Sequence, residues 1–147
     1  MKRLGILVIF MLVAASSMAF VSASEEVSIG GMDFNIPDGF DENTIYRLID
    51  DMDENGVINN IKAFEKGDDV IYICVADFGD KEMDTDSVSE LGNEFKTING
   101  VDGYTYDDGW VEGYEDVPLY GFIYAKNGDI AMIITTDESL FEEVIVK

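Results

Sequence analysis

The residues best suited to chemistry form an oxygen-rich loop in the first half of the chain. Segment 51–62 reads DMDENGVINNIK, with oxygen donors at alternate positions and a glycine at the sixth. An EF-hand loop wraps calcium in this way, and the ligands here would be Asp51, Asp53, Asn55, the carbonyl of Val57, and Asn59. The last position, which needs a bidentate carboxylate, is Lys62. The alternative interpretation, which we favour, is turn chemistry between a helix and a strand.

A second candidate site is an aromatic stretch later in the chain. Its five rings are Tyr104, Tyr106, Trp110, Tyr114 and Tyr120. Acidic residues lie between them at Asp107, Asp108, Glu112, Glu115 and Asp116. Such rings can stack on a sugar or hold a cationic group, and the acidic surroundings favour a basic ligand. They could equally serve to cover the face and edge of a sheet, and this is the interpretation we favour.

Several catalytic classes are excluded by composition. The chain has no histidine, which removes Ser–His and Cys–His hydrolases and the usual zinc sites. Cys74, the one cysteine, lies in an apolar run without a cationic neighbour, so we expect a buried hydrophobe and not a reactive thiol. A pair of carboxylates could act as in a glycosidase, but any acidic chain offers such pairs. We therefore predict a protein that is not an enzyme and has no cofactor, with calcium as the alternative through the loop at 51–62.

The charge of the chain limits its partners. Residues 24–147 contain 31 acids and 7 bases, a net charge of −24. Such a surface repels nucleic acid and anionic lipid, because it has no cationic stripe to release counterions. We predict no nucleic-acid binding, and a basic or cationic partner, either a protein or a small ligand.

The first residues have the pattern of an export signal. Met1-Lys2-Arg3 is a basic start, 4–15 is an apolar run, and Val21-Ser22-Ala23 fits the small-residue rule for cleavage. We predict a signal peptide at 1–23 and one domain at 24–147, in the extracellular space or the cell envelope. If the signal stayed uncleaved, it would serve as a membrane anchor.

Successive hairpins are predicted along the rest of the chain. Asn127-Gly128 and Asn99-Gly100 each supply two residues for a type I′ turn, and apolar strand-like runs flank both. Further hairpins are expected at 27–36, around Gly30-Gly31, and at 57–78, around 66–69.

Helices are predicted from apolar spacing. Ile45, Leu48, Ile49 and Met52 indicate a helix at 42–53, and Leu140, Phe141, Val144 and Ile145 indicate one at the C-terminus. Segment 80–93 is either a weak helix or a loop with one helical turn. The expected class is thus α+β, with two layers: an antiparallel sheet built from successive hairpins, and helices, including the C-terminal one, packed on it.

Three motifs carry a resemblance to a known group of proteins. They are FNIPDGF at 34–40, KTINGVDGY at 96–104, and the Asn127-Gly128 hairpin with its closing helix. Together they resemble small secreted proteins of methanogenic archaea, which are similar in turn to the PsbP/Mog1-like fold. The resemblance implies a central antiparallel sheet with helices packed on it, and an extrinsic, non-enzymatic protein that docks on partners. It carries over no catalytic or metal-binding residue.

Overall fold

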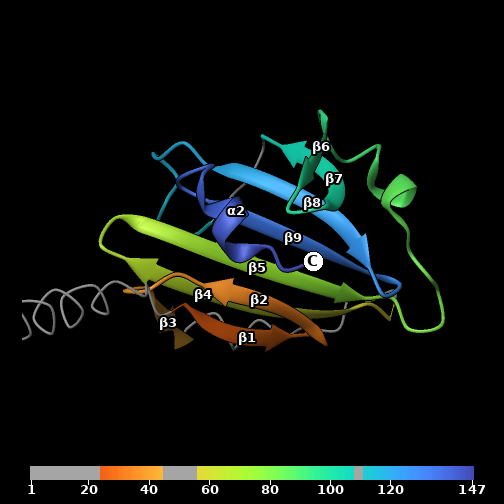
Figure 1. The fold of residues 1–147 in the computed structure, drawn as a ribbon, viewed down its shortest axis with the longest axis horizontal. Helices are drawn as coiled ribbons and strands as arrows, with labels where there is room; N and C mark the ends of the chain where they lie inside the picture. The colour runs from red at the N-terminus through yellow and green to blue at the C-terminus, as the bar shows by residue number, and fades with distance from the viewer. Residues whose placement is uncertain (1–23, 45–55, 108–110) are drawn as a thin grey trace, which may run out of the picture.

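The computed structural model describes residues 24–44, 56–107 and 111–147, and these residues form a large antiparallel sheet and a small one (Figure 1). The strands are β1 Glu25–Ile29, β2 Met32–Ile36, β3 Asp41–Asn43, β4 Ile58–Lys66, β5 Asp69–Asp77, β6 Phe95–Ile98, β7 Val101–Tyr106, β8 Tyr120–Lys126 and β9 Asp129–Thr135. The large sheet has the order β3-β4-β5-β9-β8-β7-β6, and β1 pairs with β2 alone. The helical elements are the 3₁₀ helix η2 Thr85–Val88 and the α-helix α2 Leu140–Val144.

The expected α+β class is wrong. The described chain is 53% strand, and its helical elements are one five-residue α-helix and one 3₁₀ turn. The segment predicted to open a helix at 42 is instead β3, where Glu42 and Asn43 pair with Phe64 and Ala63 of β4. The rest of that predicted helix lies outside the described residues. Pairing with β4 therefore makes residues 42 and 43 part of a strand, and the apolar residues whose spacing predicted the helix lie outside the described residues.

Segment 80–93 takes the second of its two expected forms, a loop with one helical turn. Asp84 caps η2, because its carboxylate accepts a hydrogen bond from the Ser87 amide at 2.9 Å. In this turn only Val88 is buried, so there is no apolar stripe to hold a longer helix against the sheet.

All four predicted hairpins are present. Asn99 and Gly100 have φ of 50° and 76°, and Asn127 and Gly128 have 56° and 87°. These left-handed values at both central positions are those of the type I′ turn, whose twist matches that of the flanking strands. The turns set the registers, with Ile98 opposite Val101 and Lys126 opposite Asp129.

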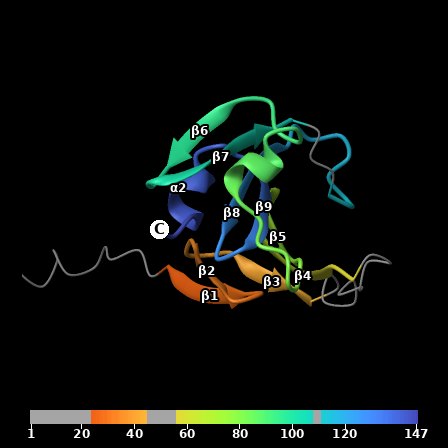
Figure 2. The same ribbon diagram turned by 90° about the vertical axis from the view of Figure 1, so that its right-hand side faces the viewer.

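The main core lies on one face of the large sheet. The sheet curls around α2 and the β1–β2 hairpin, and we call this side the concave face (Figure 2). Its central residues are fully or almost fully buried, namely Phe34, Ile71, Ile73, Val75, Phe122, Tyr124, Ala131, Ile133, Phe141 and Val144. A hairpin thus forms most of the second layer that we expected helices to form.

The opposite face, which we call convex, carries two smaller clusters. One gathers Ile61, Ala63, Val70 and Ile134 under Val111, and the other gathers Ile123 and Ile130 under Val88. Side chains of β5 are therefore covered on both faces, as its apolar sequence predicts.

Candidate functional site

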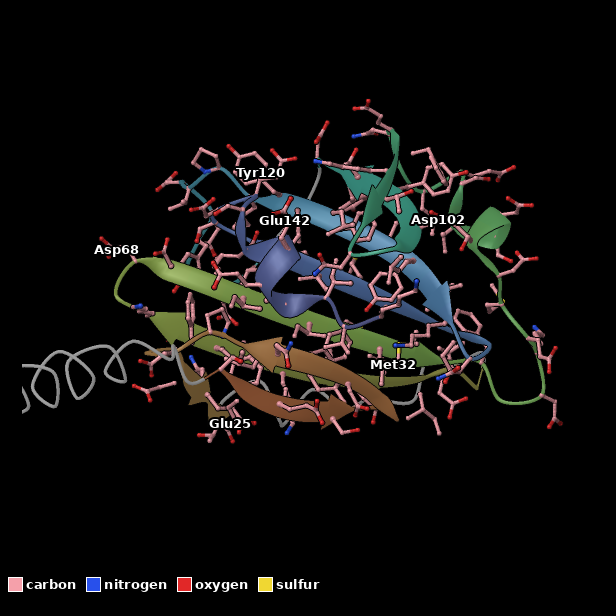
Figure 3. All side chains as sticks on the ribbon, in the orientation of Figure 1. Glu25, Met32, Asp68, Asp102, Tyr120 and Glu142 are labelled. Carbon is pink, nitrogen blue, oxygen red and sulfur yellow. The ribbon has the colours of Figure 1, made fainter. Side chains whose placement is uncertain are left out.

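A cavity of about 240 Å³ opens where β7 and β8 approach the start of α2. Its lining residues come from four segments of the chain: Asn93, Glu94, Thr105, Asp107, Tyr120, Gly121, Glu138 and Phe141. Figure 3 shows Tyr120 at the beginning of β8. The cavity thus combines two aromatic rings with three carboxylates.

Strand alternation places the aromatic ring of Tyr120 at this cavity. Tyr120, Phe122 and Tyr124 are at every second position of β8, so they share the concave face. Phe122 and Tyr124 are buried beneath α2 and the β1–β2 hairpin, but Tyr120 is the first residue of the strand and is 40% exposed. Its ring is therefore accessible to a ligand from solvent.

The carboxylates of the cavity differ in their partners. Glu138 accepts a hydrogen bond from the Lys96 ammonium at 2.8 Å, and this contact raises the pKa of Lys96. Asp107 accepts a hydrogen bond from the Asn93 side-chain amide at 2.7 Å, which orients the carboxylate without neutralising it. With Glu94 also lining the cavity, acids exceed bases, so the cavity favours an ammonium or guanidinium group.

The structure separates the five predicted aromatic residues. Tyr104 and Tyr106 point to the convex face of β7, and Tyr104 packs edge-on against Phe95 with ring centroids 5.6 Å apart. Tyr114 packs on the convex cluster of Val111, whereas Tyr120 is on the concave side. Trp110 lies outside the described residues. The sheet thus divides the rings that sequence proximity grouped together.

A second hollow, of about 360 Å³, lies beside the β4–β5 turn. It is lined by Gly67, Asp68, Gly113, Tyr114 and Val117. It contains one predicted ring, Tyr114, and one carboxylate, Asp68. Because fewer polar groups converge there, we favour the cavity at Tyr120 as the functional site.

Three of the five predicted calcium ligands, Asp51, Asp53 and Asn55, lie outside the described residues, which begin again at Gly56. Val57 precedes β4, and Asn59 lies within β4 opposite Ala76. The side-chain oxygen of Asn59 accepts a weak hydrogen bond from the Cys74 thiol at 3.9 Å. Within the described ranges, no group of three or more acidic or thiol side chains could hold a metal ion. The calcium site remains a prediction.

Cys74 is half-buried on the convex face, and burial raises the pKa of its thiol to about 11. The thiol is therefore protonated at neutral pH, which makes it a poor nucleophile.

Sequence reasoning missed most residues of the cavity. They come from three separate parts of the sequence, which share no motif: Asn93 with Glu94, then Thr105, and then Glu138 with Phe141. Tyr120 and Asp107 were noted within the aromatic, acidic stretch. The cavity exists because β6–β7 and α2 meet across the concave face, and no local pattern encodes that contact.

Comparison with family models, with curated proteins and with solved structures gave no match. Among the helices that the structure describes, none is long and apolar enough to cross a membrane.

Proposed function

We propose that this chain is a non-enzymatic, exported domain of the extracellular space or cell envelope that binds a cationic group in the cavity at Tyr120. The group belongs either to a protein partner or to a small ligand. The observation that carries the proposal is the convergence of Glu94, Asp107 and Glu138 around two aromatic rings. The export pattern at residues 1–23 supports the location.

The size of the cavity indicates what it can accept. Pockets for drug-sized ligands and cofactors measure roughly 300–1,000 Å³. A cavity of about 240 Å³ is smaller, and suits the head and part of the stem of one lysine or arginine side chain. The guanidinium group could donate to the carboxylates while its plane stacks on the Tyr120 ring, which is the geometry that arginine favours.

The composition of the chain supports a binding role over catalysis. Nucleophilic catalysis by a Ser–His or Cys–His pair needs a histidine, and the chain has none. Its one cysteine has a raised pKa and lies on the convex face, whereas the cavity is on the concave side.

The test is a titration of residues 24–147 with N-acetyl-arginine amide, followed by the NMR signals of the protein at physiological salt. We expect saturable shifts at Tyr120, Thr105 and Phe141. Tyr120→Ala should weaken binding by about 2- to 5-fold, because an exposed cation–π contact contributes about 0.5–1 kcal/mol.

Charge variants separate the cavity from the general acidity of the protein. Asp107→Asn should raise the dissociation constant by up to about 5-fold, the range of an exposed ion pair. Asp33→Asn is the matched control, since it removes the same charge at an exposed position of β2, away from the cavity. Equal weakening by both variants would show diffuse attraction only and would overturn the proposal, as would shifts that centre elsewhere.

A further inference from the structure

Strand β6 forms an open edge of the large sheet. It pairs with β7 on one side and ends the strand order on the other (Figure 1). An edge strand presents unpaired N–H and C=O groups, which can pair with an added strand. The opposite edge strand, β3, has only three residues. The β6 edge is therefore the longer of the two.

The turn chemistry identifies the backbone groups that face outward. Ile98 and Val101 flank the two-residue turn, so they form a hydrogen-bonded pair, and Lys96 with Gly103 is the next one along the ladder. The Thr105 amide then donates to the Glu94 carbonyl at 2.8 Å, which continues the alternation. The backbone groups of Phe95 and Thr97 consequently point away from β7, and in the described part of the chain no hydrogen bond occupies them.

The side chains beside this edge are apolar and exposed on the convex face. Phe95 is 55% exposed and Leu91 is 57% exposed. Phe95 packs against the ring of Tyr104, and Gly92, which follows Leu91 in sequence, lies against the Tyr104 side chain. The lysine of the strand, Lys96, points to the concave face and is paired with Glu138. It therefore does not hinder the addition of another strand, as an unpaired lysine at the edge would.

The negative charge around the β6 edge favours a basic partner. Segment 84–107 carries six acids and one lysine, a net charge of −5, and all six acids are exposed. A second copy of this chain would meet the same negative charge and be repelled. A segment with lysine or arginine beside apolar residues would meet opposite charge and cover Phe95 and Leu91.

We propose that β6 is a docking edge at which an extended basic segment of a partner protein adds as a further strand of the sheet. The backbone groups of Phe95 and Thr97 supply the hydrogen bonds, and alternating apolar residues of the partner pack on Phe95. The proposal does not depend on the cavity, because Phe95 and Thr97 do not line it.

The test uses an acetylated, amidated peptide of eight alternating lysine and valine residues, added to residues 24–147 at physiological salt. The main readout is amide hydrogen exchange by NMR. In the free protein, the amides of Phe95 and Thr97 should exchange fast and those of Lys96 and Ile98 slowly. Saturating peptide should slow exchange at Phe95 and Thr97. A control peptide with proline in place of each valine should not bind, because proline lacks the amide proton of a strand.

A pair of variants at one position isolates the backbone contribution. Thr97→Pro removes the outward amide and places a ring at the edge, a position where proline is tolerated because that amide faces solvent. Thr97→Val is the matched control, since it also removes the hydroxyl that donates to Asp102 at 2.6 Å but keeps the amide. We expect binding to Thr97→Pro to be at least about tenfold weaker than to Thr97→Val.

Three results would overturn the proposal. The first is no binding at about 1 mM peptide, a concentration at which even weak association is detected. The others are equal affinity of the two Thr97 variants for the peptide, and protection from exchange that omits the Phe95 and Thr97 amides. If Thr97→Pro fails to fold by circular dichroism, the exchange pattern of the unmodified protein decides alone. If the peptide does not bind at β6 while N-acetyl-arginine amide still binds at Tyr120, the docking edge is refuted and the proposed function of the cavity stands.

Discussion

Asn99 joins the β6–β7 turn to the end of α2, and its replacement tests how the curled sheet is held closed. Its side-chain amide donates to the Glu142 carbonyl at 2.6 Å and to the Ile145 carbonyl at 3.0 Å. These carbonyls lie at the end of a helix, where backbone acceptors lack partners within the helix. Asn99 also sits at φ 50°, a left-handed conformation that asparagine tolerates better than alanine does.

Asn99→Ala therefore loses both the two hydrogen bonds to α2 and the tolerance for positive φ, and Asn127→Ala is the control that separates these two contributions. Asn127 has φ 56° and precedes a glycine in the same turn type, but its side chain makes no hydrogen bond within the described structure. Left-handed strain should cost about 1 kcal/mol in either variant. The two hydrogen bonds, partly exposed, should add about 1–2 kcal/mol at Asn99. We expect losses of about 1 kcal/mol for Asn127→Ala and about 2–3 kcal/mol for Asn99→Ala.

The assay is urea unfolding of residues 24–147, with the free energy of unfolding taken by linear extrapolation. Asn99→Asp provides a second arm, because aspartate keeps the tolerance for positive φ but brings an acceptor to the two carbonyls. It should be destabilising, whereas Asn127→Asp should change stability little. Equal losses for the two alanine variants would refute the argument that Asn99 ties the hairpin to α2.

Two further predictions concern ionisation. Because the pKa of Cys74 is about 11, against a usual 9.0, its reaction with a disulfide reagent at pH 8 should be about 100-fold slower in the folded protein than in urea; comparable rates would contradict its burial. Desolvation, with the nearby Asp77 charge, raises the pKa of Asp129. Because the pKa of this carboxyl is higher in the folded state than in the unfolded state, its charge destabilises the fold at neutral pH. That destabilisation is lost as the pH falls from above the folded-state pKa to below the unfolded-state pKa. Asp129→Asn should therefore raise the melting temperature at pH 7, with less effect near pH 3, and a lower melting temperature at pH 7 would contradict this sign.

Local turn chemistry made the hairpins predictable. Asn-Gly at 99–100 and 127–128 specifies its own backbone angles, and the strands beside it inherit their register from the turn. The same locality applies to Asp84, which caps a single turn through a residue three positions away. These features needed no information from distant parts of the chain.

The fold class and the candidate site depended on contacts between residues that are far apart in sequence. The C-terminal helix is short because Ile145 is extended and bridges to Phe34 of β2, more than a hundred residues earlier. The predicted aromatic group was divided because Tyr104 and Tyr120 point to opposite faces of the curled sheet, a relation that depends on the register between β7 and β8. The spacing of residues along the chain predicts neither the early end of this helix nor the opposite orientation of the two tyrosines.

By itself, the sequence determined the acidity, the absence of histidine, the hairpins and their turns, because these depend on composition or on residues a few positions apart. Only the tertiary structure decided which layer covers the sheet, which carboxylates meet around Tyr120, and that β6 lies at an edge. The physical reason is that each of these depends on how strands far apart in sequence pair and curl, and many different pairings satisfy the same local preferences.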